Sequence, residues 1–304
     1  MADDCLNKKK KNVAIIGLGL LGASLGMALR GREYHRIGWN RRAGVNAWAL
    51  EHDVVDEAFD RVEDAIAGAD ITVLCLPIPM IKDFIAGYAD CWRPGSIVTD
   101  IGSVKQVIVE QGEKYLEPRN VHFVGSHPMA GTEKSGCEAA FPALYDNAEA
   151  FVTRTGGTNG DAFTEVRRLW ESIGVRVVEL APEAHDVLVA HTSHMLHVVA
   201  LALAQAVLDC PDEHDRQLRF SGCATGFRDT SRIASSSPRM WREIIENNRE
   251  AALTTIESFE NRLSHLRKMI AAGDFDGFEQ EFAHGKELRD GWVAYKAAKS
   301  KKQM

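Results

Sequence analysis

The chain has 304 residues, and its 36 basic and 43 acidic side chains give a formal net charge of −7. This length suffices for two domains, and the acidic balance argues against a nucleic-acid partner. No apolar run approaches the roughly 20 residues of a membrane span, and no amino-terminal apolar segment indicates a signal peptide. The six cysteines form no CxxC pair. We therefore expect a cytoplasmic protein without a disulfide framework.

Short apolar segments alternate with helical segments through the first half of the chain. Strands are predicted at residues 13–16, 36–39, 71–76, 96–100, 121–125, 150–154 and 175–179. Helices are predicted at residues 18–30 and 161–173. Such alternation is typical of a doubly wound parallel sheet with helices on both faces. We expect this α/β domain to span residues 1–180.

A Gly-rich loop follows the first predicted strand. It comprises Gly17, Leu18, Gly19, Leu20, Leu21 and Gly22. In this Rossmann-type GxGxxG pattern the first glycine permits a tight turn, the second lets the backbone approach a pyrophosphate, and the third lets helix and strand pack closely. Because the loop lies between a strand and a helix, the sequence predicts that these residues bind a dinucleotide.

The end of the second predicted strand bears on the choice between NAD and NADP. NAD enzymes of this fold usually place an acidic residue there to bind the ribose 2′-hydroxyl, whereas this chain has Asn40, Arg41 and Arg42. Two guanidinium groups without a carboxylate favour the 2′-phosphate of NADP. NAD stays open, because surface arginines often face solvent and Asn40 can bond a bare ribose.

Polar residues also follow the later strands, whose carboxyl ends hold ligands in open α/β sheets. We expect Leu76, Pro77 and Asp100 to contact the cofactor. His127 follows the strand at residues 121–125, in a loop rich in Gly and Pro. Histidine ionises near neutral pH, which suits a general base acting on a reacting hydroxyl.

After Ala181 the strand signals stop, and a helical domain is predicted over residues 181–304. One apolar seam recurs there every three or four residues. It consists of Ile256, Phe259, Leu263, Leu266 and Ile270. Such a seam indicates one long helix, which packs either within the domain or against a second copy in a homodimer.

Two clusters in the helical half are candidates for substrate binding. His191, His194 and His197 recur every three residues. A metal site is disfavoured because no carboxylate stands at HExxH spacing, so we expect one of them to reach a substrate carboxylate. Residues 226–241 carry several arginines, one of which can clamp a carboxylate while the others form surface ion pairs.

At this point the sequence resembles the prephenate/arogenate dehydrogenases of tyrosine biosynthesis. The matching segments, in the family's order, are GLGLLGASLGMALR, LCLPIP, TDIGSVK, GSHPMAGTEKSGCEAA, HDVLVAHTSHMLH and GFRDTSRIASSSPRMWREI. The resemblance implies a Rossmann domain, a helical dimerisation domain and an active site between them. It also implies hydride transfer from ring C4 to NAD(P) with loss of CO2, giving 4-hydroxyphenylpyruvate or tyrosine.

The resemblance assigns roles to three catalytic positions. His127 matches the histidine that bonds the C4 hydroxyl of the substrate. Ser103 matches the serine that supports this histidine and the hydroxyl. Arg232 matches the arginine that binds the ring carboxylate.

The resemblance also assigns roles around the pocket. His197 and His194 match histidines near the substrate's side chain, and Glu133 matches a gating or ion-pairing position. Asp229 and Trp241 match the helical wall of the pocket. Where the family usually has a proline two residues after His194, this chain has Leu196, which predicts a straighter helix.

Two other classes of protein fit parts of the pattern. A β-hydroxyacid dehydrogenase also joins a Rossmann half to a helical half, but it needs a helical lysine, and residues 181–241 contain none. A dimeric NAD(P) sensor would bind the cofactor and need neither His127 nor Arg232. The sequence does not choose between prephenate and arogenate.

Overall fold

The computed structural model describes residues 10–132 and 134–301. By its internal contacts the chain divides into two compact units, Met1–Ala252 and Leu253–Met304. The first unit contains both sheets and the helices that follow them. The second contains most of one long helix and all of another.

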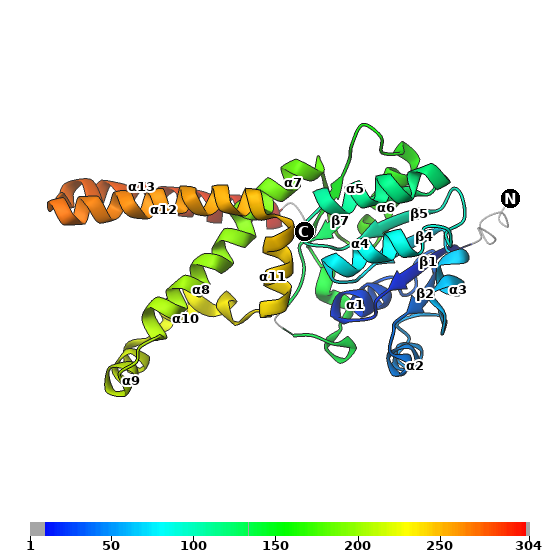
Figure 1. The fold of residues 1–304 in the computed structure, drawn as a ribbon, viewed down its shortest axis with the longest axis horizontal. Coiled ribbons are helices and arrows are strands. Elements are labelled where there is room, and N and C mark those ends of the chain that lie inside the picture. The colour runs from blue at the N-terminus through cyan, green and yellow to red at the C-terminus, as the bar shows by residue number, and fades with distance from the viewer. Residues whose placement is uncertain (1–9, 133, 302–304) are drawn as a thin grey trace. The chain divides into compact units, whose positions relative to one another are not determined.

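A parallel six-stranded sheet forms the centre of the first unit (Figure 1). The strand order is β3-β2-β1-β4-β5-β6. The strands are β1 Lys11–Ile16, β2 Tyr34–Trp39, β3 Glu57–Ala58, β4 Ile71–Leu74, β5 Ile97–Asp100 and β6 His122–Val124. The predicted doubly wound fold is confirmed, and the short strand β3 is an addition.

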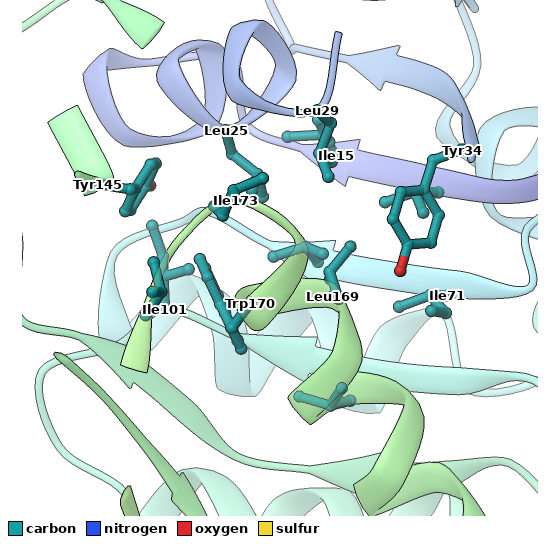
Figure 2. Close-up of a cluster of buried hydrophobic side chains, with 14 of the residues drawn as sticks. Ile15, Leu25, Leu29, Tyr34, Ile71, Ile101, Tyr145, Leu169, Trp170 and Ile173 are labelled. Carbon is teal, nitrogen blue, oxygen red and sulfur yellow. The ribbon is translucent and has the colours of Figure 1, made fainter. Parts of the chain in front are cut away.

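Helices cover both faces of this sheet. One face carries α1 Leu20–Ala28, α2 Ala43–Glu51 and α6 Gly160–Ser172; the other carries α3 Val62–Ala67, α4 Ile78–Gly87 and α5 Gln106–Tyr115. Successive side chains of β1 alternate between the two cores, with Val13 and Ile15 in one and Ala14 and Ile16 in the other. Because a strand has a side-chain period of two, both faces are apolar. Figure 2 shows the first core, where Trp170 and Tyr145 are fully buried.

A second sheet of three strands follows the first along the chain. It comprises β7 Ser126–Pro128, β8 Glu149–Thr153 and β9 Arg176–Leu180. Strands β7 and β8 are antiparallel, and β8 and β9 are parallel. The prediction that His127 lies in a loop was wrong, because it is the middle residue of β7 and pairs with Phe151. Short 3-10 turns lie at Glu117–Arg119, Cys137–Ala139 and Pro142–Tyr145.

The rest of the first unit is helical, as predicted. Its helices are α7 Pro182–Val189, α8 Met195–Leu208, α9 Glu213–Gly222, α10 Thr225–Ser231 and α11 Pro238–Asn247. A 3-10 turn at Arg232–Ser235 joins α10 to α11. Between α7 and α8 the chain forms a π-helical turn, Ala190–His194. The prediction of a straighter helix was therefore wrong. Although the chain lacks the proline, its backbone departs from the regular α-helix at this turn. π-Helical turns of this kind often occur at functional sites.

The helix that continues through this turn also corrects the expectation that the chain has no apolar segment long enough to span a membrane. Pro182–Leu208 is long and apolar enough to cross a membrane by length and composition, with a mean hydropathy of 1.7 in its most apolar window. This is weak evidence for a membrane span, because the helix carries His185, Asp186 and His194 as buried polar residues.

The second unit pairs two long helices. Helix α12, Arg249–Ala272, begins at the end of the first unit, and α13 is Phe275–Lys301. The two run alongside each other (Figure 1). The predicted seam lies on α12, where Leu263 and Ile270 are more than half exposed. The prediction of one long helix is confirmed.

Candidate active site

The Gly-rich loop has the geometry that the sequence predicts. Gly17 has φ +101°, and a Cβ there would lie 2.3 Å from the Cys75 carbonyl oxygen. A Cβ on Gly22 would lie 2.0 Å from the Gly17 carbonyl oxygen. A Cβ on Gly19, at the start of α1, would have no neighbour within 4 Å. Two glycines are therefore required by packing, while the third leaves open space where phosphates fit.

The leucines of this loop differ from one another. Leu18 is fully buried in the core. Leu21 packs against the same core, and its carbonyl accepts a bond from the Tyr145 hydroxyl at 2.9 Å. Leu20 is the first residue of α1 and half-buried. Any cofactor contact from Leu18 therefore comes from its backbone.

A cavity of about 550 Å³ opens at this end of the sheet. It is lined by Gly17, Gly19, Trp39, Asn40, Arg41, Arg42, Cys75, Leu76, Pro77, Met80, Asp83, Phe84 and Tyr88. Seven predicted cofactor residues thus share one cavity. This lining suits a dinucleotide: apolar side chains can pack against a base, the glycines leave room for phosphates, and the two arginines can bind an anionic group.

Asn40 stands where NAD enzymes usually place an acid. Its side-chain oxygen accepts the Arg42 backbone N–H at 3.0 Å, and its own backbone N–H donates to Asn46 at 2.7 Å. The loop is thereby fixed without a carboxylate at the strand end. Arg41 and Arg42 are among the residues that line the cavity.

The carboxylate of Asp100 is fully buried and forms an ion pair with Lys105, which is fully buried too. It also accepts the Gly102 backbone N–H at 2.8 Å. The predicted contact of Asp100 with the cofactor stays a prediction. Lys105 donates to the Ser126 carbonyl at 2.9 Å. This pair ties the loop after β5 to the strand that carries His127.

His127 lies at the start of a chain of hydrogen bonds. Its Nδ1 is 2.9 Å from Nε2 of His185, and Nδ1 of His185 is 2.8 Å from Oδ1 of Asp186. His185 and Asp186 are buried. Burial, followed by the neighbouring His185, holds the pKa of His127 well below its usual value. His127 is therefore neutral at neutral pH, as a general base must be.

Two more histidines lie on the neighbouring helix. His194 is buried, and its Nδ1 is 3.1 Å from Nδ2 of Asn248. Burial lowers the pKa of His194 to about 4. His197 stacks on Trp241 with ring centroids 3.7 Å apart, and its Nδ1 is 2.9 Å from the Ser193 carbonyl. Burial also lowers the pKa of His197, and the charge of Arg232 acts in the same direction.

The arginines of residues 226–241 separate into two kinds. Arg228 pairs with Asp229, and Arg239 pairs with Glu243. Arg232 forms no ion pair within the part of the chain that the structure describes, and it influences His197 electrostatically. Among these three arginines, Arg232 is therefore the one whose charge is not paired with a carboxylate of the described residues. Asp229, predicted at the pocket wall, is an exposed partner of Arg228.

Ser103 is half-buried in the loop between β5 and α5. Within the described residues, no hydrogen bond joins Ser103 to His127. Glu133 lies outside the described residues. The role of each stays a prediction.

Sequence reasoning missed the residues that hold His127. His185 and Asp186 stand 58 and 59 positions after it, and Lys105 stands 22 positions before it. The adjacent His-Asp pair at the start of a helix was the available signal, but nothing in the spacing connects it to β7. The described residues contain no cluster of three or more His, Cys, Asp or Glu that could hold a metal.

A nucleotide cavity at the sheet edge, together with neutral histidines and an arginine that has no ion-pair partner among the described residues, fits an NAD(P)-dependent dehydrogenase. Comparisons give the particular family. Residues 25–179 match the family model of the prephenate dehydrogenase nucleotide-binding domain, and residues 181–284 match its dimerization domain. The chain therefore belongs to the prephenate dehydrogenase family, whose members are oxidoreductases.

Individual relatives agree with this result. The chain is 32% identical to cyclohexadienyl dehydrogenase of Zymomonas mobilis, over 92% of this chain and 95% of the relative. It is 30% identical to prephenate dehydrogenase of Bacillus subtilis, over 94% and 77%. The crystal structure of A. aeolicus prephenate dehydrogenase with hydroxyphenyl propionate and NAD+ superposes with a TM-score of 0.85 at 32% identity, covering 93% and 98%. Synechocystis arogenate dehydrogenase gives 0.82 at 31%, covering 92% and 99%.

Proposed function

We propose that the protein oxidises and decarboxylates prephenate, arogenate or both, with His127 as the base and NADP as the favoured cofactor. The observation that carries this proposal is the geometry of His127, which is neutral and tied through Nδ1 to His185. Its Nε2 is then the nitrogen left for the substrate. When bound, the nicotinamide accepts the hydride that leaves ring C4.

In this mechanism His127 takes the proton of the C4 hydroxyl as the carbonyl forms. Loss of the ring carboxylate as CO2 then gives an aromatic phenol, which makes the sequence strongly downhill. A buried base with a lowered pKa binds this proton only while the carbonyl develops. As CO2 leaves, its bonding electrons pass through the ring to the C4 oxygen, which takes the proton back from His127; this gives the phenol and returns His127 to its neutral form.

Arg232 and His197 are proposed to hold the substrate's carboxylates. Arg232 has no ion-pair partner among the described residues, and its charge is felt at His197. Binding of the departing ring carboxylate by Arg232 should act mainly on ground-state affinity. Trp241 fixes the plane of the His197 ring by stacking, so the histidine keeps one orientation in the pocket.

The proposed preference for NADP rests on the end of β2. Arg41 and Arg42 line the cavity, and Asn40 stands in place of the usual acid. An acid there would repel a 2′-phosphate, whereas guanidinium groups attract it. The absence of an acid at this position favours NADP without excluding the ribose of NAD.

We also propose that the protein is a homodimer in the cytoplasm, formed through its helical region. Leu263 on α12 and Phe282 and Trp292 on α13 are each more than half exposed. Apolar surface of this extent on two long helices is typical of a protein interface. Light scattering coupled to gel filtration tests the predicted dimer.

The test of function is a steady-state assay of prephenate and arogenate, each with NAD and with NADP. Turnover in any of the four mixtures supports the reaction, and the ratios of kcat/KM give the substrate and cofactor preferences. Folded protein that binds cofactor and turns over neither substrate would contradict the proposal. A clear preference for NAD would instead show that Arg41 and Arg42 do not select the cofactor.

A further inference from the structure

We propose that His185 and Asp186 are positioning residues that fix the ring tautomer of His127, so that its Nε2 is always the atom that receives the substrate proton. The proposal rests on the proposed function for the identity of the substrate. The tautomer itself follows from hydrogen bonds that exist before any substrate binds. It assigns a task to two buried polar residues that the sequence left unexplained.

The first step is the direction of the bonds at Asp186. Its Oδ1 lies 2.7 Å from the Lys105 backbone nitrogen, and its Oδ2 lies 3.0 Å from the Gln106 backbone nitrogen. Backbone N–H groups can only donate, so both carboxylate oxygens accept at the start of α5. The carboxylate is held in place by these bonds, and Oδ1 also faces Nδ1 of His185 at 2.8 Å.

The second step is the tautomer of His185. Burial is the main cause that lowers its pKa, so the ring is neutral near neutral pH and carries a single N–H. If that hydrogen were on Nε2, a bare Nδ1 would face a carboxylate oxygen at 2.8 Å, which places two acceptors against each other. The hydrogen of His185 is therefore on Nδ1, and its Nε2 is an acceptor.

The third step is the tautomer of His127, which follows from that of His185. Nε2 of His185 and Nδ1 of His127 are 2.9 Å apart. Because the first is an acceptor, the second must carry the hydrogen. A neutral His127 then has a bare Nε2, which is the basic atom. The order carboxylate, imidazole, imidazole extends the logic by which a buried carboxylate orients a catalytic histidine.

The surroundings of the pair support neutral rings. The ammonium of Lys105 lowers the pKa of both His127 and His185, although burial is the larger cause for each. His194 acts in the same direction on His127. Lys105 itself is bonded to Asp100 and to the Ser126 carbonyl. Two adjacent imidazolium rings are therefore strongly disfavoured, and the site carries at most one extra proton.

The reaction uses this arrangement as follows. The O–H bond of the C4 hydroxyl breaks, its proton forms a new bond to Nε2 of His127, and its electron pair becomes part of the C=O bond as the hydride leaves C4 for the nicotinamide. His127 is then an imidazolium whose Nδ1–H donates to His185. This bond to a charged donor is stronger than the one in the resting state, so the relay stabilises the product of proton transfer.

Nitrogen-15 NMR of the histidine rings in the cofactor-free protein tests the tautomer directly. His127→Asn assigns the His127 signals by their disappearance. The expected result near neutral pH is that His127 and His185 both carry their hydrogen on Nδ1. Finding His127 with its hydrogen on Nε2 would overturn the proposal. This readout needs no turnover, so its outcome is separate from that of the proposed function.

Kinetics of a matched pair of variants test the consequence. In His185→Gln an amide oxygen can still accept from Nδ1 of His127, whereas His185→Leu removes the acceptor and keeps an apolar volume. We expect kcat of the Leu variant to be at least about 10-fold below that of the Gln variant, with similar KM. Equal kcat in the two folded variants would contradict the relay. If the Leu variant does not fold, the tautomer measurement on the wild type still decides.

Discussion

The nucleotide cavity and the histidine cluster are built in different ways within the same unit. The Gly-rich loop of the cavity is shaped by its backbone, since Gly17, Gly19 and Gly22 follow one another within six residues. The cluster is shaped by side chains from distant segments, with His127 on β7 and His185 on α7. The loop is specified by local sequence, and the cluster exists only once the chain has folded. Mutations should therefore separate binding from chemistry.

The largest effect is expected from His127→Asn. Loss of the general base should lower kcat by about 10²- to 10⁴-fold. The dissociation constant of the reduced cofactor, measured by its fluorescence, should stay within about threefold of wild type, because the nucleotide cavity does not include His127. An unchanged kcat would show that His127 is not the base.

Arg232→Ala should act on affinity instead. A charge-assisted bond to a carboxylate is worth about 1.5–3 kcal/mol, so KM should rise by roughly 10- to 150-fold. Arg228→Ala is the matched control, because that arginine already pairs with Asp229 at the surface. Equal KM values for the two variants in steady-state assays would contradict the assignment of Arg232.

The glycines offer a comparison within the nucleotide cavity. Gly22→Ala places a Cβ against the Gly17 carbonyl, which should lower the free energy of unfolding by about 1–3 kcal/mol. Gly19→Ala meets no neighbour in the protein, so it should leave stability unchanged and weaken cofactor binding. Denaturant unfolding and cofactor titration of both variants measure this, with Gly68→Ala as control. Normal cofactor affinity in Gly19→Ala would argue against a pyrophosphate at this position.

The buried His194 should make stability depend on pH. Its folded pKa of about 4 lies below its usual value of 6.5, so the unfolded chain binds the proton more tightly and stability falls as pH decreases from 6.5 towards 4. This group alone should cost about 2 kcal/mol between about pH 7.5 and about pH 5. Urea unfolding at both pH values checks this. His194→Asn should reduce the pH dependence of the free energy of unfolding. An unchanged pH dependence would show that His194 is not its cause.

The smallest effect is expected at the end of β2. Replacing Arg41 and Arg42 together by Ala should weaken NADP binding by roughly 10-fold. NAD binding should stay nearly constant, because it has no 2′-phosphate. Titration of both cofactors against wild type and the double variant measures the difference. Equal losses for NAD and NADP would remove these arginines from cofactor selection.

The same contrast explains how much the sequence could predict. All strands except β3 and β7, together with helices α1 and α6, were predicted from the alternation of apolar and helical segments, and the nucleotide loop was predicted from three glycines at fixed spacing. The place of His127 after a predicted strand made it a candidate base, and the resemblance to a known family then assigned roles to His127 and Arg232. The buried Asp100–Lys105 pair was not foreseen. The position of Asp100 at a strand end suggested a ligand contact, whereas its side chain is buried in the protein. A residue's place in the chain does not tell which way its side chain faces.

His185 and the π-helical turn escaped prediction for a related reason. His185 bonds to His127, 58 positions earlier, because α7 packs against the second sheet. The sequence contains no periodic pattern that indicates this packing. The turn at Ala190–His194 arises in a sequence without proline or glycine, so no residue type marks it. The predicted roles of Ser103 and Glu133 stay predictions.

The most direct test of the central claim is the stoichiometry of the reaction with the substrate and cofactor pair that turns over fastest. Reduced cofactor and released CO2 are measured in the same mixture. We predict one CO2 for each reduced cofactor, with an aromatic phenol as the product. Reduced cofactor without CO2 would identify a simple alcohol dehydrogenase and contradict oxidative decarboxylation at this site.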